Sequence, residues 1–456
     1  MKEVEDPIMI LKRLTPSQIL VIGFALTILT GTLLLSLPIS TESGKSLPFI
    51  DALFTSTSAV CVTGLVVVDT ATTFSTFGEV VILLLIQIGG LGFMTFGTFF
   101  AILVGKKIGF RERLILKEAF NQLNVSGVVR LVLMVLAITL IIEGLGFTFL
   151  AIRFVPEWSW GKGLWYALFH SVSAFNNAGF DLFGDMEKFS SLIRYVGDPM
   201  VNLTISSLII LGGIGFVVIL ELAQFCMTKR LSLHSKLVLT MTAFLIFAGT
   251  ILILGTEWSN PATLGKLSFG DKLLASYFQS VTTRTAGYNT LNIGDMYPAM
   301  LFFIILLMFV GASPSSTGGG VKTTTLATIL LAVWGMIRGR DNVVAYRRRI
   351  PYNQVYKALT VTVAALVLVI TITMLLTITE HTDILTSMFE TVSAFGTVGL
   401  TMGLTPSLST AGKILIIFTM FAGRLGPMTI AVAIARSLHH QQEPLIRFPE
   451  ENPLIG

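Results

Sequence analysis

Four near-copies of one short motif, each ending in glycine, are the feature that most constrains how this chain folds. They read SAVCVTG at 58–64, SAFNNAG at 173–179, VTTRTAG at 281–287 and SAFGTVG at 393–399. Each follows a phenylalanine, at Phe54, Phe169, Phe278 and Phe389. The final glycines lie roughly 110 residues apart, much farther than the repeats of solenoids and propellers. The sequence therefore predicts four units of membrane-spanning size.

The composition places these units in a lipid bilayer. Hydrophobic residues make up 53% of the 456 residues and charged residues 12%, whereas soluble domains carry about 25% charged residues. A helix needs about 20 mostly apolar residues to cross a bilayer. We expect eight such spans, two per unit, at 16–37, 76–104, 130–154, 200–226, 237–255, 297–337, 358–379 and 411–437. The first apolar run is of full length, so we expect it to stay rather than be cleaved as a signal peptide.

The placement of Lys and Arg predicts that both termini are cytoplasmic, because the basic clusters at 106–113 and 338–349 then lie on the cytoplasmic side. The net charge of +5 is accounted for in this way, and we expect no nucleic-acid binding. Cys61 and Cys226 lie on separate apolar segments and are expected to be free thiols. The expected organisation is a cytoplasmic N-terminus at 1–13, repeats at 14–105, 106–236, 237–350 and 351–437, and a cytoplasmic tail at 438–456.

The segment before each glycine turn is helical in character but too short to cross the bilayer, as at residues 49–60. Non-helical backbone is tolerated at membrane depth only where protein buries it or it lines water, so four such turns should converge on one aqueous axis. Glycine frees the backbone angles, and the negative end of each short helix favours a cation. Small-residue helix packing is the alternative interpretation.

We therefore predict a cation filter made mainly of backbone carbonyls, as in potassium channels. The expected filter residues are Cys61, Val62, Thr63, Gly64, Asn176, Asn177, Ala178, Gly179, Thr285, Ala286, Gly287, Gly396, Thr397, Val398 and Gly399. These turns share just the glycine, and the third is one residue shorter counted from its phenylalanine. We expect K⁺ to be preferred over Na⁺ by a modest margin.

The second span of each unit carries glycines, as in GGLGF at 89–93, GGIGF at 212–216 and GRLGP at 423–427. These glycines should let the helices pack closely and bend. The third unit has GASPSSTGGGVK at 311–322, where a proline and three consecutive glycines oppose a helix. This run should split the span around a mobile gating loop. The expected gate residues are Gly311, Ser313, Pro314, Thr317, Gly318, Gly319, Gly320, Lys322 and Arg424.

Two basic residues of the predicted gate admit more than one role. The loop is not a nucleotide-binding P-loop, because Val321 separates Gly320 from Lys322. Lys322 is either part of the gate or a lysine that extends from a helix end to the membrane surface. Arg424 replaces a glycine of the other units at membrane depth, where charge is costly and usually functional. It either pairs with loop carbonyls or sets an electrostatic barrier.

Several further polar residues stand near the ends of the spans. Glu79, Asp198 and Asp295 are candidates for helix N-caps or for a cation-gathering mouth, and Asp198 followed by Pro199 reads best as a cap. His170 is expected to be hydrogen-bonded within its pore helix rather than to ligate a metal. Glu143 and Glu221 receive no assigned role.

The motifs, in this order, resemble those of the Trk/Ktr/HKT superfamily of potassium transporters, and most closely the membrane subunit of bacterial Ktr systems. The resemblance covers almost the whole chain and rests on the four turns, VTTRTAGY at 281–288, GASPSSTGGGVKTTT at 311–325 and AGRLGP at 422–427. It implies an all-α membrane protein of four helix, pore-loop, helix repeats, with eight transmembrane and four pore helices around a pseudo-fourfold pore. It also implies filter glycines at Gly64, Gly179, Gly287 and Gly399, and a gate at 311–322 beside Arg424.

The same resemblance implies K⁺ uptake across the bacterial cytoplasmic membrane, and activation by Na⁺ in several members. It implies a homodimer on a cytosolic ring of KtrA-type subunits that bind ATP or ADP, with no nucleotide on this chain. An enzyme is not expected, because HExxH and GxSxG motifs are missing from the sequence. An ion-coupled symporter for organic solutes would need unwound helices whose N-termini face an anionic substrate, whereas pore helices present the opposite end. Whether flow is passive or coupled to a Na⁺ or proton gradient is left open.

Overall fold

Four long apolar helices frame the computed structural model, which describes residues 15–104, 108–119, 127–185, 187–340, 342–426 and 429. They are α2 (Pro16–Leu35), α8 (Val128–Trp158), α12 (Leu233–Glu257) and α16 (Tyr352–Glu380). Each is long and apolar enough to cross a bilayer. Each also exposes large apolar side chains, among them Leu26, Leu140, Phe247 and Val367. An apolar outer surface of this kind suits contact with lipid.

A short, largely buried helix packs on each long helix. These helices are α3 (Phe49–Val60), α9 (Trp160–Phe175), α13 (Phe269–Thr282) and α17 (Ile384–Gly396). In the first three units a serine of the short helix donates a hydrogen bond to a carbonyl of the long helix. The pairs are Ser56 to Ile28 (2.7 Å), Ser171 to Glu143 (2.6 Å) and Ser280 to Ile246 (2.8 Å). The predicted short pore helices are confirmed in all four units.

The second half of the first three units is a broken helix. α5 (Thr76–Leu91) and α6 (Phe93–Leu103) meet at 95°, and α10 (Pro199–Ile214) and α11 (Phe216–Thr228) meet at 102°. The breaks fall at Gly92 (φ 83°) and Gly215 (φ 94°). α14 (Pro298–Phe309) and α15 (Thr323–Ile337) are separated by residues 310–322. In the fourth unit α18 (Thr410–Leu425) ends against Gly426, whose φ is 84°.

These breaks show how far the predicted bends go. The glycines of the segments 76–104 and 200–226 were expected to let the helices bend, and in each segment a glycine with positive φ turns the chain, by 95° and 102° respectively. Among the described residues, four helices are long enough to span, or six when each sharply bent pair counts as one span. The predicted split of span 297–337 is confirmed.

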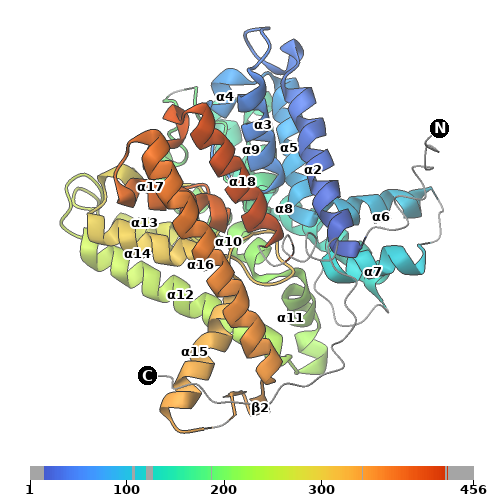
Figure 1. Ribbon diagram of the computed structural model, residues 1–456. Coiled ribbons are helices and arrows are strands. Elements are labelled where there is room, and N and C mark those ends of the chain that lie inside the picture. Colours follow the sequence, from blue (N-terminus) through green and yellow to red (C-terminus); the bar gives the residue numbers. More distant parts are fainter. Residues whose placement is uncertain are drawn as a thin grey trace.

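Short elements complete the described chain. They are α4 (Thr70–Thr73), α7 (Phe110–Ala119), 3₁₀ turns at Pro38–Ser40, Ile193–Tyr195, Ile293–Asp295 and Thr405–Ser407, and strands β1 (Val344–Ala345) and β2 (Arg348–Arg349). The strands pair antiparallel, with Val344 opposite Arg349 and Ala345 opposite Arg348. In Figure 1 the hairpin, α11 and α15 lie at the end of the molecule opposite α4.

Of the three acidic residues that were candidates for helix N-caps, Asp198 alone is one. Asp198 caps α10, accepting from the amides of Met200 and Val201, with Pro199 in the first turn. The N-cap of α5 is Ser75, and Glu79 instead accepts from the indole of Trp165 at 2.6 Å. Asp295 lies in a 3₁₀ turn, and the N-cap of α14 is Tyr297.

His170 is buried in α9 and hydrogen-bonded as predicted, with Nδ1 2.7 Å from the carbonyl oxygen of Tyr166. Cys61 is a buried free thiol, and the side chain of Cys226 lies outside the described part of the structure. The predicted termini at 1–13 and 438–456, and residues 427, 428 and 430–437 of the predicted span 411–437, also lie outside the described part. The boundaries of the four repeats stay predictions.

Candidate functional site

Each pore helix ends in the same local backbone conformation. A residue with positive φ follows the helix, and a glycine with positive φ comes two residues later. The first position is held by Val62, Asn177, Thr285 and Thr397, with φ of 52°, 58°, 73° and 52°. The second is held by Gly64, Gly179, Gly287 and Gly399, with φ of 85°, 69°, 85° and 94°. The sequence repeats glycine at the second position because other residues rarely adopt this conformation.

Hydrogen bonds of the helix C-termini close these turns. In the first, second and fourth turns an amide bonds the carbonyl five residues earlier, namely Thr63 to Ser58, Ala178 to Ser173 and Val398 to Ser393, each at 2.8 Å. This is the Schellman pattern of helix ends. In the third turn the amide of Ala286 bonds Thr282, four residues earlier, at 3.0 Å. The third turn, which is one residue shorter in the sequence, is thus closed by a hydrogen bond that spans one residue fewer.

The four glycines form a closed ring in chain order. A Cβ on Gly64 would lie 2.5 Å from the carbonyl oxygen of Ala178, and one on Gly179 would lie 2.3 Å from that of Ala286. A Cβ on Gly287 would lie 2.5 Å from the carbonyl oxygen of Val398, and one on Gly399 would lie 2.3 Å from that of Thr63. Each turn therefore contacts the next through backbone, and the fourth returns to the first. No side chain fits at these four positions without displacing a carbonyl.

The structure brings the other predicted filter residues to the same place. All of them are buried, namely Cys61, Val62, Thr63, Asn176, Asn177, Ala178, Thr285, Ala286, Gly396, Thr397 and Val398. Adjacent turns are also joined by a side-chain hydrogen bond, from Asn177 Nδ2 to Thr285 Oγ1 at 2.9 Å. Asn176 differs from the rest, because its side chain bonds Gln87 and Glu143 of other helices. That these residues hold an ion stays a prediction.

Residues 311–322 pack against the ends of α9 and α10. The amides of Ser313 and Thr317 donate to the carbonyls of Gly213 (3.0 Å) and Gly212 (3.2 Å) at the end of α10. Thr317 Oγ1 also donates to the carbonyl of Phe175, the last residue of α9, at 3.3 Å.

The loop contacts the third and fourth turns as well. The amide of Gly319 donates to Thr397 Oγ1 at 2.8 Å. A Cβ on Gly318 would lie 2.3 Å from Thr285 Oγ1, so glycine is required there for the loop to approach. The loop therefore lies directly across one side of the ring.

Arg424 joins the loop to another unit. Its guanidinium donates to the carbonyl of Thr317 in the loop, and to the carbonyls of Gly89 and Gly90 at the end of α5, the last at 3.0 Å. Of the two roles left open by the sequence, pairing with a loop carbonyl is the one for which the structure has a contact. Charge-assisted hydrogen bonds of this kind are stronger than neutral ones.

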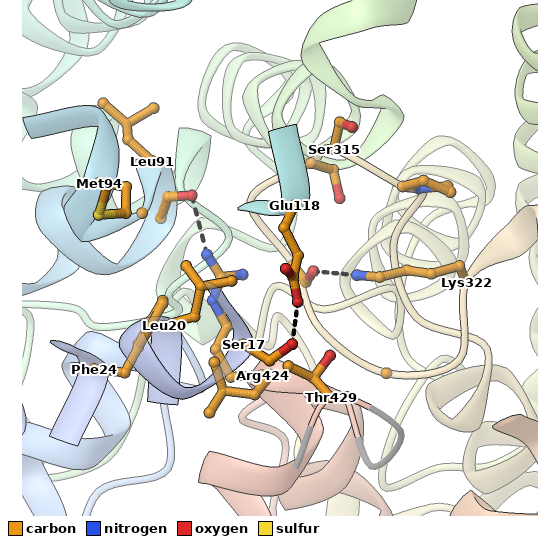
Figure 2. Close-up of a pocket in the computed structure, with 18 of the residues that line it drawn as sticks. Ser17, Leu20, Phe24, Leu91, Met94, Glu118, Ser315, Lys322, Arg424 and Thr429 are labelled. Carbon is orange, nitrogen blue, oxygen red and sulfur yellow. Dashed lines mark hydrogen bonds between the residues drawn. The ribbon is translucent and has the colours of Figure 1, made fainter. Parts of the chain in front are cut away.

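Lys322 is partly buried beside the loop rather than extended to the surface. Its Nζ lies 2.7 Å from the carbonyl oxygen of Gly318 and 3.5 Å from that of Gly319. The ammonium thus closes the loop on itself and adds a second positive charge near Arg424. Figure 2 shows both basic side chains on opposite sides of the same cavity.

The cavity has a volume of about 480 Å³ and is lined by the loop, Arg424, the N-terminal half of α2 and the junction of α5 with α6. Glu118 of α7 reaches into it and accepts a hydrogen bond from Ser17 (Figure 2). A second cavity of about 830 Å³ shares Pro314, Ser315 and Lys322 of the loop and adds Glu221 and His234. The loop therefore lies between the ring and these two cavities. Sequence reasoning missed Glu118 and Ser17, and no motif marks either residue.

The comparisons with known proteins agree with this architecture. Residues 12–446 match the TrkH family, described as cation transport protein. The Ktr system potassium uptake protein B of Bacillus subtilis (strain 168) is 49% identical over 444 residues, covering 97% of each chain. The potassium/sodium uptake protein NtpJ of Enterococcus hirae is 42% identical, covering 98% of each. The Ktr system potassium uptake protein B of Vibrio alginolyticus is 41% identical, covering 96% of this chain and 94% of its own.

A solved structure has the same fold. The potassium transporter TrkH of Vibrio parahaemolyticus superposes with a TM-score of 0.69 over 90% of this chain and 84% of its own, at 17% identity. At that identity the likeness establishes the architecture alone, an all-helical membrane fold with pore-loop repeats. The extent of the sequence match establishes more, and the chain belongs to the TrkH family of cation transport proteins.

Proposed function

We propose that this protein takes up potassium ions across the bacterial cytoplasmic membrane through the ring of four glycine turns. The observation that carries the proposal is the closed contact of each filter glycine with a backbone carbonyl of the next turn. Carbonyl oxygens at close quarters can replace the hydration shell of a monovalent cation. The printed names of the relatives, potassium uptake and potassium/sodium uptake proteins, support the same ion class.

The pore helices favour a cation at the ring. The C-terminal ends of α3, α9, α13 and α17 meet there, and each carries a partial negative charge. The shorter third turn leaves fewer matched carbonyls, so K⁺ is preferred over Na⁺ by a modest margin. We assign the filter to the residues predicted from the sequence. The name of the Enterococcus relative, a potassium/sodium uptake protein, favours some Na⁺ transport as well.

Residues 311–322 are the gate in this proposal, and they face the cytoplasm together with both termini. The contacts of the loop with Phe175 and Thr397 support a closed state in which the loop obstructs the path below the ring. Arg424 and Lys322 raise the barrier, because two positive charges next to the path oppose a cation. Opening requires the loop to leave both contacts.

Regulation belongs to partners in this proposal. The protein works as a homodimer on a cytosolic ring of regulatory subunits that bind ATP or ADP, with Na⁺ as an activator. Support comes from the word system in the names of the Ktr relatives, which denotes more than one component.

The test is uptake of radioactive rubidium by liposomes that contain the purified protein. Uptake should exceed that of empty liposomes, be inhibited by K⁺ at lower concentration than by Na⁺, and rise when the regulatory ring with ATP is added. Uptake equal to that of empty liposomes under all conditions contradicts the proposal. Repeating the assay with an imposed Na⁺ gradient separates passive from coupled flow.

A further inference from the structure

Three polar side chains form a triangle of hydrogen bonds behind the second turn of the ring. Asn176 Nδ2 donates to Gln87 Oε1 at 2.7 Å and to Glu143 Oε1 at 3.1 Å. Gln87 Nε2 donates to Glu143 Oε2 at 3.2 Å. The residues come from α5, α8 and the end of α9, so the triangle joins three elements from two units.

The triangle lies inside the protein at membrane depth. Asn176 is 0% exposed and Glu143 is 7% exposed. Polar and ionisable groups in such places are expensive, and they are usually functional. Neither Glu143 nor Gln87 has a part in the filter or the gate as described above.

The triangle is specific to one unit of the pseudo-symmetric structure. The pore-helix serines Ser56, Ser171 and Ser280 donate to Ile28, Glu143 and Ile246 respectively, so Glu143 stands where the first and third units have isoleucine. Two residues before the paired glycines, α5 has Gln87 and α10 has Ile210. The compared units therefore have apolar residues at both places, so the repeated architecture does not by itself call for polar side chains there.

The triangle fixes the start of the second turn. Asn176 directly precedes Asn177, the residue of positive φ that begins the turn, and Asn177 in turn bonds Thr285 of the third turn. A Cβ on Gly90 would lie 2.0 Å from Asn176 Oδ1, so α5 also contacts this side chain directly. Movement of Asn176 would therefore displace the carbonyls of the second turn.

We propose that Glu143 is a positioning residue for ion selection. Its carboxylate holds the amides of Asn176 and Gln87, and so keeps the second turn at the distance from the other three that suits the selected ion. It does not touch the ion. The inference rests on the proposed function, since it assumes that the ring selects a monovalent cation.

The triangle also borders the gate. The carbonyls of Gly89 and Gly90, which accept from Arg424, follow Gln87 within one turn of α5. A displacement of the end of α5 would therefore change both the second turn of the ring and the hydrogen bonds of Arg424. The selectivity measurement below is therefore made at saturating rubidium as well as at low rubidium, which separates ion binding from opening.

The decisive variant is Glu143→Met, which keeps the length of the side chain and removes both acceptors. We measure rubidium uptake by proteoliposomes. The KM for rubidium should rise by about fivefold or more, and the preference for K⁺ over Na⁺ should fall by a similar factor, because the buried amides of Asn176 and Gln87 lose their partner. The maximal rate should change less than the KM. Glu157→Gln is the control, since Glu157 lies on the same helix but pairs with Arg153 and Arg194 at its far end.

A rescue variant tests the triangle itself. Exchanging the two residues, Gln87→Glu with Glu143→Gln, keeps a donor and an acceptor for each of the three hydrogen bonds of the triangle. It should restore the wild-type preference for K⁺ over Na⁺. This exchange also carries the test if Glu143→Met fails to give a monodisperse protein. A wild-type ion preference in Glu143→Met, or an exchange variant as unselective as Glu143→Met, overturns the inference. If the wild-type protein transports no rubidium, the proposed function fails instead.

Discussion

The guanidinium of Arg424 donates a hydrogen bond to the carbonyl oxygen of Thr317, and this contact ties α18 to the loop that crosses the ring. The same guanidinium reaches Gly90 of α5 at 3.0 Å. One positive side chain thus holds together the fourth unit, the first unit and the loop of the third. A planar group with several donors is suited to this bridging.

Replacement of Arg424 by alanine should increase cation flux, because both the bond to the loop and the positive charge beside the path are lost. A hydrogen bond from a charged group contributes about 1.5–3 kcal/mol, so the rise should be about tenfold or more. Rubidium uptake measures it. Arg424→Lys should give an intermediate flux, since one ammonium cannot bridge the three carbonyls. Arg338→Ala, at an exposed arginine after α15, is the control, and unchanged flux in Arg424→Ala would refute the role.

Serine in place of Gly64 or Gly287 should lower the preference for K⁺ over Na⁺. Each new Cβ would lie 2.5 Å from a carbonyl oxygen of the next turn, so the ring must widen. A loss of about 1.4 kcal/mol in differential binding is a tenfold loss of preference. Inhibition of rubidium uptake by K⁺ and by Na⁺ gives the ratio.

Gly44→Ser is the matched control for these two variants. Gly44 has a φ of 67°, in the same left-handed region, but nothing lies within 4 Å of its Cβ position. It carries the backbone strain without the collision, so its ion preference should equal that of the wild type. An intact preference in both Gly64→Ser and Gly287→Ser would count against selection by these carbonyls.

The sequence predicted the turns and the loop because their chemistry is local. A glycine at one place in four copies indicates positive φ, and Pro314 with Gly318, Gly319 and Gly320 cannot continue a helix. The sequence indicated that the glycines at 89–93 and 212–216 let the helices bend, but it did not indicate that the chain would turn sharply at Gly92 and Gly215, because glycine in an apolar run is usually tolerated in a helix. At Gly215 the loop packs closely, because the Pro314 carbonyl oxygen would lie 2.5 Å from a Cβ there, whereas nothing lies within 4 Å of a Cβ on Gly92.

Contacts between distant residues were not predictable in the same way. Gln87 and Glu143 are both polar residues in apolar spans, which marks them as unusual, but nothing local indicates that they meet at Asn176. The sequence likewise marks Arg424 as costly without saying which carbonyls it binds. Such pairings depend on how units far apart in the chain pack, and only the three-dimensional structure supplies that.

Replacing Thr397 by valine should make the closed gate less stable. Valine keeps the shape but removes the acceptor of the Gly319 amide, which lies 2.8 Å from Thr397 Oγ1. A buried amide without a partner costs about 1–3 kcal/mol, so basal rubidium uptake should rise about fivefold or more.

Thr360→Val serves as its control, because the Thr360 hydroxyl bonds the carbonyl of Tyr356 on the exposed face of α16. Uptake should match the wild type there. If basal uptake by Thr397→Val is not raised, the Gly319 contact does not hold the loop closed.

The affinity for cations should depend on pH through Asp181. This residue lies two positions beyond Gly179, and the next residue, Leu182, donates its amide to the ring of His170 at 3.4 Å. Burial, together with the nearby charge of Asp69, raises the pKa of Asp181 from 3.8 to about 7, although a hydrogen bond from the amide of Phe183 lowers it in part. Because the folded pKa is raised, protonation favours folding, and this stabilisation is lost as the pH rises from about 4 through about 7.

We expect ionised Asp181, which follows the ring glycine Gly179 by two residues, to attract cations to the ring, since a negative charge at a pore mouth concentrates them. The KM for rubidium should therefore fall severalfold as the outside pH is raised through 7, while the maximal rate changes little. Asp181→Asn should abolish the dependence, whereas Asp271→Asn, in the first turn of α13, should retain it. A KM that is independent of pH in the wild type, or a dependence that persists in Asp181→Asn, would show that another group is responsible.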